Sequence, residues 1–282
     1  YSRLKVLEQD IDNKDTREDL KDHAARIKTQ LTSINQAIEL RDEDHVYWLE
    51  KSGRSGQLVT LRSAPLEVSE YLRETIFNRR TSAVLASATL AHDQSMKGFQ
   101  KNVGAEPERT QIEASPFDYQ RNMQVFVATD SPAPSPREGR LDIDYLADMI
   151  QFCALRVEGG TLALFTSYAD LSRVADRVAE SIHNAGRELL VQGRDFSRSE
   201  LKTRFLDAEN GILFGTDSFW TGFDAPGPAL SQVIICRLPF VNPSHPLPEA
   251  KAEKIKARGG SPFSELTLPD ALIKFRQAMV KK

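Results

Sequence analysis

Between residues 143 and 235 the sequence alternates short apolar runs with segments of helical periodicity. Short apolar runs bounded by glycine or polar residues are typical of strands that are buried on both faces of a sheet. The alternation predicts an α/β fold in which helices cover both faces of a parallel sheet and functional loops follow the carboxyl ends of the strands. The predicted strands are Thr161–Phe165, Leu189–Val191, Ile212–Phe214 and Val233–Ile235, and the predicted helices run from Ile143 to Arg156, through Leu171, Val174, Val178 and Ile182, and from the capping box of Ser197 and Glu200 to Ala208.

The first 90 residues follow a different pattern. A stripe of apolar residues at alternating spacings of four and three predicts a long helix with a heptad seam. After it, Val46–Glu50 and Leu58–Leu61 flank a Gly/Ser turn and predict a β-hairpin. A helix from about Leu66 to Phe77 and an apolar strand over Ser82–Leu90 are expected to follow. The stripe consists of Leu20, Ala24, Ile27, Leu31, Ile34 and Ile38.

Composition excludes several classes of protein. The 282 residues are 40% hydrophobic, which suffices for a core, but no apolar run approaches the roughly 20 residues of a membrane helix. The N-terminus lacks the apolar segment of a signal peptide, so we expect a cytoplasmic protein without membrane contact. Cys153 and Cys236 are too few for a disulfide framework or an iron–sulfur cluster, and the histidines lack metal-ligand spacing.

Charge neither indicates nor excludes nucleic-acid binding. The formal net charge of -3 gives no global attraction to phosphates, so binding would depend on local basic patches. Asn78–Arg80 forms one candidate patch, and the other consists of Lys251, Lys254, Lys256 and Arg258. Taken singly, each is also consistent with ordinary solvated surface charge.

The loop GTDSFWTGFDAPG, residues 215–227, follows the apolar run Ile212–Phe214. Its glycines permit close approach of the backbone to a ligand, and its aspartates and adjacent aromatic pair offer polar and stacking contacts. Taken alone, the loop is equally consistent with an ordinary strand-to-helix turn that carries a surface tryptophan.

Four segments occur in this order along the chain: Ala86–Leu90, Leu164–Tyr168, Ser218–Gly227 and Ala271–Gln277. Together they resemble the second half of a superfamily 2 helicase motor of the DinG-like/XPD-like type. The resemblance covers roughly residues 41–282 and implies a RecA-like parallel sheet with helices on both faces. It also implies three regions: a helical segment at 1–40 that ends an arch-like insertion, a remnant of the first RecA-like domain at 41–92, and the second RecA-like domain at 93–282. The four segments correspond, in the same order, to motif III, motif IV, the motif of the glycine-rich loop and motif VI.

The resemblance also implies roles for individual residues. Gly222, Asp224 and Gln277 would line the nucleotide cleft, and Gln277 would act in catalysis together with Lys281, which stands at an arginine position of the family. The other motif residues would face nucleic acid, where aromatic side chains stack on bases. These residues are Ser87, Thr89, Thr166, Ser167, Ser218, Phe219 and Trp220.

This sequence departs from the family pattern in ways that bear on ATP hydrolysis. Thr221 stands where the family usually has glutamate, and Ala278–Lys282 replaces Gly-x-Gly-Arg and a later arginine. A lysine is a point charge that cannot reproduce the bidentate fork of an arginine. The phosphate-loop pattern GxxxxGK[ST] does not occur. Asp42–His45 imitates an acidic Mg²⁺ box, but it precedes a predicted strand instead of following one, so we interpret it as a solvated turn.

Three functions remain open at this point. The first is the C-terminal motor half of a DinG-like ATP-dependent DNA helicase that acts in DNA repair on single-stranded DNA. It would be inactive alone and would hold ATP and Mg²⁺ only together with the first RecA-like domain. The second is a degenerate, non-catalytic helicase-like module that binds nucleic acid or a protein. The third, an unrelated α/β nucleotide or sugar enzyme, leaves the ordered motifs unexplained.

Overall fold

A computed structural model gives the fold of the chain. It describes residues 3, 6–7, 13–40, 42–52, 56–79, 81–91, 95–107, 109–115, 117–132, 142–194, 196–221, 223, 225 and 227–279. Within these residues no helix is both long enough and apolar enough to cross a membrane.

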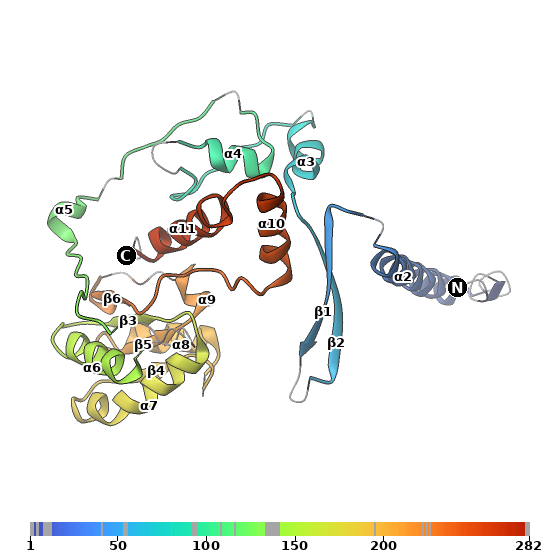
Figure 1. Cartoon of the computed structure of the whole chain (residues 1–282). Helices are drawn as coiled ribbons and strands as arrows, with labels where there is room; N and C mark the ends of the chain where they lie inside the picture. The colour runs from blue at the N-terminus through green and yellow to red at the C-terminus, as the bar shows by residue number, and fades with distance from the viewer. Residues whose placement is uncertain are drawn as a thin grey trace. The chain divides into compact units, whose positions relative to one another are not determined.

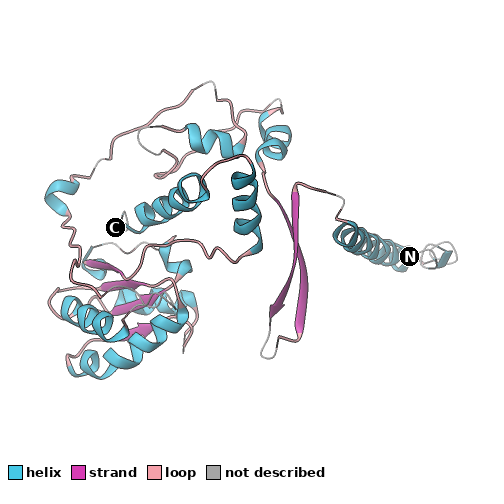
Figure 2. Cartoon of the chain, in the orientation of Figure 1, coloured by secondary structure: helices cyan, strands magenta, loops and turns pink. Residues whose placement is uncertain are grey.

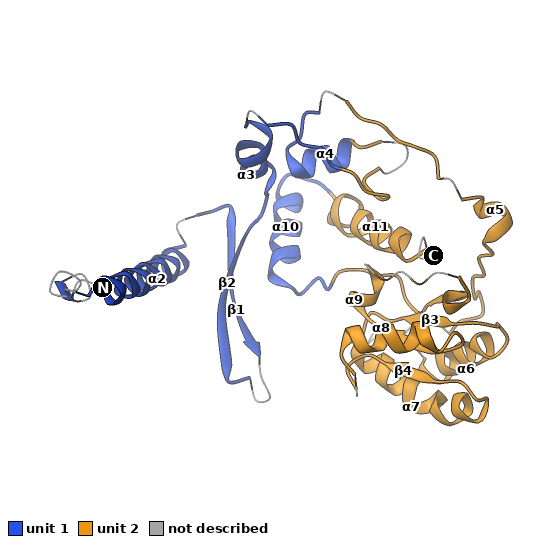
Figure 3. Ribbon diagram, turned by 180° about the vertical axis from the view of Figure 1, so that it is seen from behind, with its two compact units in different colours: residues 1–85, 97–108, 242–260 blue, residues 86–96, 109–241, 261–282 orange. Residues whose placement is uncertain are grey.

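The chain divides into two compact units, drawn in blue and orange in Figure 3. The first contains residues 1–85, 97–108 and 242–260, and the second contains residues 86–96, 109–241 and 261–282. The boundaries of these units differ from the domain boundaries expected after residues 40 and 92. Residues 86–96 belong to the unit that holds the parallel sheet.

The first unit combines helices with an antiparallel hairpin (Figure 1). Strands β1 and β2 pair from His45 opposite Pro65 to Ser52 opposite Leu58, which confirms the predicted hairpin. The helix after it starts at Ser69, and its second half, Arg73–Phe77, is wound as a π-helix. The elements are α2 (Lys14–Glu39), β1 (His45–Ser52), β2 (Leu58–Pro65), α3 (Ser69–Leu72), α4 (Lys97–Val103) and α10 (Pro246–Ala257).

Local backbone and side-chain contacts determine where helix α2 begins and ends. The Asn13 side chain accepts hydrogen bonds from the amides of Asp15 and Thr16, and Leu40 ends the helix in the left-handed conformation with φ of 45°. The predicted heptad stripe lies on this helix, where Leu31 and Ile38 are largely exposed.

The second unit is built around a four-stranded parallel sheet of order β4-β5-β3-β6, drawn in magenta in Figure 2. From the inner strand β3 the chain goes to the edge strand β4, returns to β5 between these two, and then crosses to β6 at the other edge. This arrangement confirms the predicted α/β class. The elements are α5 (Tyr119–Asn122), α6 (Ile143–Ala154), β3 (Thr161–Leu164), α7 (Tyr168–Asn184), β4 (Leu189–Val191), α8 (Arg198–Asp207), β5 (Ile212–Gly215), α9 (Asp217–Trp220), β6 (Gln232–Ile235) and α11 (Leu268–Met279).

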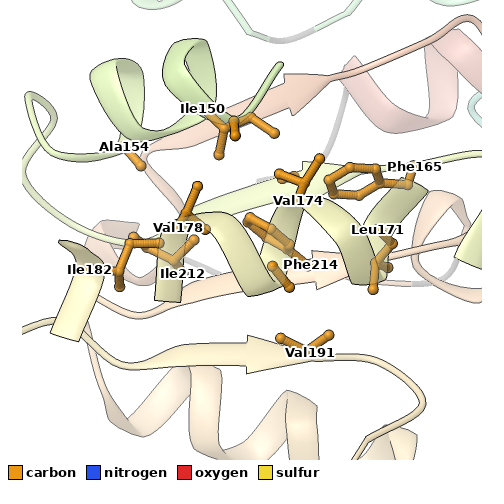
Figure 4. Packing of buried hydrophobic residues seen from close by; sticks show 13 residues of the cluster. Ile150, Ala154, Phe165, Leu171, Val174, Val178, Ile182, Val191, Ile212 and Phe214 are labelled. Atoms are coloured by element: carbon orange, nitrogen blue, oxygen red, sulfur yellow. The ribbon is translucent and has the colours of Figure 1, made fainter. Parts of the chain in front are cut away.

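Alternate residues of the buried strands supply two separate apolar cores. Ala163 and Phe214 face α6 and α7 in the core of Figure 4, whereas Leu162 and Leu213 face the opposite core beneath α8, α9 and α11. Side chains of successive strand residues point to opposite faces, so a sheet that is apolar in every position must be covered on both. This packing explains why the sequence shows continuous apolar runs.

The predicted strand over residues 82–90 is wrong. Residues 82–87 have no regular secondary structure, and Val84 is 90% exposed. A strand is stabilised by its neighbours in a sheet, and no described strand pairs with this segment. The apolar residues favour a strand, but the sequence does not show which strand would pair with it.

Candidate functional site at the carboxyl edge of the sheet

The carboxyl ends of β3, β4 and β5 lie at one edge of the parallel sheet, and each is followed by polar residues. Ser167 follows β3 and caps α7, since its hydroxyl accepts a hydrogen bond from the Asp170 amide at 3.4 Å. Thr166 beside it is exposed. Parallel α/β sheets bind ligands at this edge, so these residues form the candidate site.

Gln192 joins the loops at this edge. Its side-chain oxygen accepts hydrogen bonds from the Thr216 amide at 2.7 Å and the Thr216 hydroxyl at 3.1 Å. Its side-chain nitrogen donates to the Tyr168 hydroxyl at 2.8 Å and the Ser218 hydroxyl at 2.9 Å. Sequence reasoning missed Gln192, although a polar residue directly after a buried strand was the signal that could have found it.

Arg198, at the start of α8, supports the loop after β5. Its guanidinium donates to the Ser218 carbonyl at 2.7 Å and to the Thr221 carbonyl at 3.4 Å. The same guanidinium lies 5.7 Å from the centre of the Phe219 ring. Thr221, at the family's glutamate position, is exposed.

The prediction that Phe219 and Trp220 face nucleic acid is wrong. Both side chains are 0% exposed and belong to the core beneath α8 and α11. The Trp220 indole donates to the Phe165 carbonyl at 2.9 Å, so even its polar atom is used internally. Neither ring can stack on a base, because helix α9 turns both toward the sheet.

Tyr168 is the exposed aromatic residue at this edge. Its side chain is 54% exposed, and its hydroxyl is held by Gln192. Gly193 lies against the ring: a β-carbon there would come within 3.3 Å of Tyr168 Cε1, and the Gly193 φ of +85° is unfavourable for other residues.

Helix α11 brings Gln277 to the segment of motif III. The Gln277 side-chain nitrogen donates to the Thr89 hydroxyl at 3.2 Å across 188 residues of sequence. The neighbouring Arg276 donates to the Ala91 carbonyl at 2.7 Å. Ser87 is exposed and its hydroxyl lies 3.4 Å from that of Thr89. The structure therefore brings Ser87, Thr89 and Gln277 together.

Two further contacts tie α11 to the loop after β5. Lys274 Nζ lies 3.6 Å from the Asp217 carboxylate. Ala278 is fully buried in the same core as Phe219 and Trp220. The helix that carries Gln277 is thus anchored on the element that carries Ser218.

Three of the predicted site residues, Gly222, Asp224 and Lys281, lie outside the described residues. Their roles stay predictions.

The Cys236 thiol, directly after β6, is not available as a nucleophile. Burial raises the pKa of the Cys236 thiol, and the nearby Asp170 charge raises it further. A thiol in this state stays protonated and unreactive near neutral pH. No described group of histidine, cysteine, aspartate or glutamate residues is arranged to hold a metal ion.

In the first unit, the basic stretch that contains Lys254 and the acidic turn before β1 contact each other. Lys254 of the basic stretch lies 3.1 Å from the Asp44 carboxylate and 3.3 Å from that of Glu67, and these bonds raise its pKa. His45 Nδ1 lies 2.7 Å from Asp42. The acidic turn before β1 is exposed, as the interpretation of a solvated turn requires, and its Asp44 forms an ion pair with Lys254.

Comparison with known proteins defines the class. Residues 149–279 match the model of the helicase C-terminal domain, and this range contains the whole parallel sheet, the capped helices α7 and α8, and Gln277. These residues are therefore a helicase C-terminal domain with a RecA-like fold.

Individual relatives place the chain within that class. It is 34% identical over 243 residues to the 3'-5' exonuclease DinG of Bacillus subtilis, covering 84% of this chain and 26% of the relative. It is 32% identical over 249 residues to the ATP-dependent DNA helicase YoaA of Escherichia coli, covering 88% and 37%. It is 34% identical over 263 residues to the ATP-dependent helicase DinG of Mycobacterium tuberculosis, covering 92% and 38%. Residues 149–279 are thus the helicase C-terminal domain of a chain that resembles these DinG-like helicases, and the chain spans between about a quarter and two fifths of the length of these relatives.

Proposed function

We propose that the chain is the C-terminal motor half of an ATP-dependent DNA helicase, which contributes motifs III to VI and works only with a first RecA-like domain. One observation carries this proposal: a continuous series of contacts connects the four motif segments. Thr89 contacts Gln277, Lys274 of the same helix contacts Asp217, and Ser218 is joined through Gln192 to Tyr168. These contacts support the proposal, because a motor half needs its motif segments next to one another.

The motif residues divide into those that would contact the nucleotide and those that would contact DNA. Gln277, Gly222 and Asp224 would meet the nucleotide, while Ser87, Thr89, Thr166, Ser167, Ser218 and Tyr168 would contact single-stranded DNA. ATP supplies the free energy for movement when bound, and Mg²⁺ would be held mainly by the first domain, because a motor of this class needs phosphate-loop and acidic ligands for it. In the present chain Gln277 holds its side-chain nitrogen in a fixed place, half-buried and bonded to Thr89.

Fluorescence anisotropy with labelled single-stranded DNA across a salt series tests the DNA-binding half of the proposal. We expect weak binding whose affinity falls steeply with salt, because phosphate contacts release counterions. We also expect no ATP hydrolysis above background by the chain alone, with or without DNA. Affinity that is indifferent to salt, or DNA-stimulated phosphate release that survives Asp224→Ala, would contradict the proposal.

The second candidate function is a non-catalytic module that binds nucleic acid or protein. The departures at Thr221 and Lys281 favour it, since neither side chain reproduces the family's charged group. Failure of a complete two-domain motor to hydrolyse ATP after the arginine is restored would support this second function. A cytoplasmic location, expected from the composition of the sequence, and a role in DNA repair, implied by the resemblance, stay predictions.

A further inference from the structure

Gln192 lies outside every motif segment, yet its side-chain amide is fully used in hydrogen bonds. A primary amide offers two acceptor lone pairs and two N–H donors. Here both acceptor positions are taken by Thr216, and the two donors serve Tyr168 and Ser218. The Gln192 main-chain amide also donates to the Phe214 carbonyl at 3.0 Å, which fixes the start of the side chain to the edge of the sheet.

The bonds to Thr216 satisfy groups that water cannot reach well. Thr216 is only 4% exposed, and its main-chain N–H follows the last hydrogen-bonded residue of β5. A buried N–H without an acceptor costs free energy, so Gln192 determines how the chain leaves β5 and enters helix α9. The position of Ser218 depends on that exit.

The bond to Tyr168 fixes an exposed ring. The hydroxyl end is held by Gln192, and the ring lies against Gly193, where a β-carbon would come within 3.3 Å of it. An exposed tyrosine normally samples several rotamers, and a ligand that has to immobilise the ring loses affinity. A ring that is already held in place spares a ligand part of that cost.

We propose that Gln192 is a positioning residue that holds the Tyr168 ring and the Ser218 hydroxyl in one geometry for single-stranded DNA. The inference rests on the proposed function, because it assigns DNA to this edge of the sheet. Gln192 acts through its neighbours: it connects the segment after β3 to the segment after β5, and Gly193 provides the surface on which the ring lies. The ligand chemistry is an unpaired base that stacks on Tyr168 with its phosphate near Ser218.

Two substitutions at the same position separate geometry from stability. Gln192→Met has a similar length and removes all four hydrogen bonds. Gln192→Glu can keep them, because its carboxylate accepts from the Thr216 amide and the three hydroxyls can rotate to donate. Gln192→Glu adds a negative charge next to the proposed phosphate path, so it should weaken DNA binding without loosening the loop.

Gln232→Met is the matched control. Gln232 is also a half-buried glutamine, and it bonds the Thr161 hydroxyl at 3.4 Å at the amino-terminal end of the sheet. It therefore reports the general cost of replacing a partly buried glutamine in this sheet. It should leave the affinity for DNA unchanged.

Hydrogen exchange by mass spectrometry measures the geometry, and anisotropy with a labelled oligothymidine at low salt measures affinity. For Gln192→Met we expect faster exchange over residues 216–221, with β3 and β5 still protected, and an affinity about tenfold lower, within the range of losing one stacked base. Gln192→Glu should exchange like the wild type, with lower affinity whose deficit shrinks as salt rises. Tyr168→Phe combined with Gln192→Met should bind no more weakly than Gln192→Met alone, since both act through one contact.

The outcomes distinguish this inference from the proposed function. Normal DNA binding by Gln192→Met, or unchanged exchange over residues 216–221, overturns the positioning role alone. Equal losses for Gln192→Met and Gln232→Met overturn it as well, because they would reflect stability. No salt-dependent DNA binding by the wild type overturns the proposed function and the positioning role together.

Discussion

Trp220 shows how one side chain can reverse an expectation about function. The sequence places it in a loop with glycines and aspartates, where an aromatic residue suggests stacking on a ligand. In the structure its ring fills the core and its N–H donates to the Phe165 carbonyl. The local pattern does not determine which side of a one-turn helix faces the sheet, because that depends on how α8 and α11 pack above it.

Substitution of Trp220 tests this assignment. Trp220→Phe removes part of a buried ring and leaves the Phe165 carbonyl without its donor, so we expect a loss of about 2–3 kcal/mol in the free energy of unfolding. Urea denaturation measures that loss, and DNA affinity corrected for the folded fraction should not change. Phe126→Leu, at a side chain that is 86% exposed, is the control and should leave the unfolding midpoint unchanged. A stable variant with weakened DNA binding would restore the original assignment.

Arg187 holds together the opposite, amino-terminal end of the sheet. Its guanidinium donates to the carbonyls of Ala154, Val157, Gly159 and Asn210. Burial lowers its pKa, which is the expected cost of taking a cation partly out of water. The carbonyls come from two segments, residues 154–159 and the turn at Asn210, so the planar guanidinium matches an arrangement that an ammonium group cannot satisfy.

We therefore expect Arg187→Lys to destabilise the second unit by about 2 kcal/mol, although the charge is conserved. Differential scanning calorimetry would show the lower unfolding temperature. Arg173→Lys, on the exposed side of α7, makes the same chemical change and should leave the temperature within error. Equal changes in unfolding temperature for the two substitutions would contradict the stabilising role of the Arg187 guanidinium.

Among the helices, α8 shows which elements can be predicted from sequence. Ser197 and Glu200 predict a capping box, and both bonds form: the Ser197 hydroxyl accepts from the Glu200 amide at 3.4 Å, and the Glu200 carboxylate accepts from the Ser197 amide at 2.8 Å. The signal lies within four residues, so it needs no knowledge of the rest of the fold. Residues 82–87 are the opposite case, because their apolar pattern requires a neighbouring strand from elsewhere.

The capping box makes the stability of α8 depend on pH. Hydrogen bonds from Ser197 lower the pKa of Glu200 below its ordinary 4.5. A carboxyl whose pKa is lowered by folding contributes stability above its unfolded pKa and loses it as pH falls through the folded value. Glu200→Gln should therefore destabilise the chain at pH 7, and the difference from the wild type should shrink at pH values below about 4.5. Thermal unfolding followed by circular dichroism between pH 3 and pH 7 measures it, and a difference that grows on acidification would contradict the assignment.

For the chain as a whole, the sheet could be predicted but the connections within the candidate site could not. Strand and helix periodicities are local, and they correctly indicated the fold class and the edge at which the loops gather. The contact between Thr89 and Gln277 spans 188 residues, and no local pattern reveals it. The Gln192 connection was missed for a related reason, since its partners come from two other loops that only the tertiary fold brings near.

The buried position of Ala278 changes how a complete motor should be assembled from this chain. The family pattern has glycine there, but Ala278 fills space beside Phe219 and Trp220, and a glycine inside α11 would cost about 1 kcal/mol. A repaired terminus should therefore keep Ala278 and change only the residues after Met279.

The transition state of phosphoryl transfer spreads charge over the γ-phosphate oxygens, and an arginine placed there contributes about 10³-fold or more in rate. We expect the chain to stay nearly inactive as an ATPase when joined to a phosphate-loop-bearing first RecA-like domain, because Lys281 is a point charge. Val280→Gly together with Lys281→Arg should raise the DNA-stimulated steady-state rate by orders of magnitude in that fusion, and Lys281→Gln should not.

Full activity with the native lysine would show that Lys281 suffices or that Arg276 supplies the charge after leaving the Ala91 carbonyl. Arg276→Lys in the same fusion would then separate those two explanations, and no gain after the double substitution would favour the non-catalytic module.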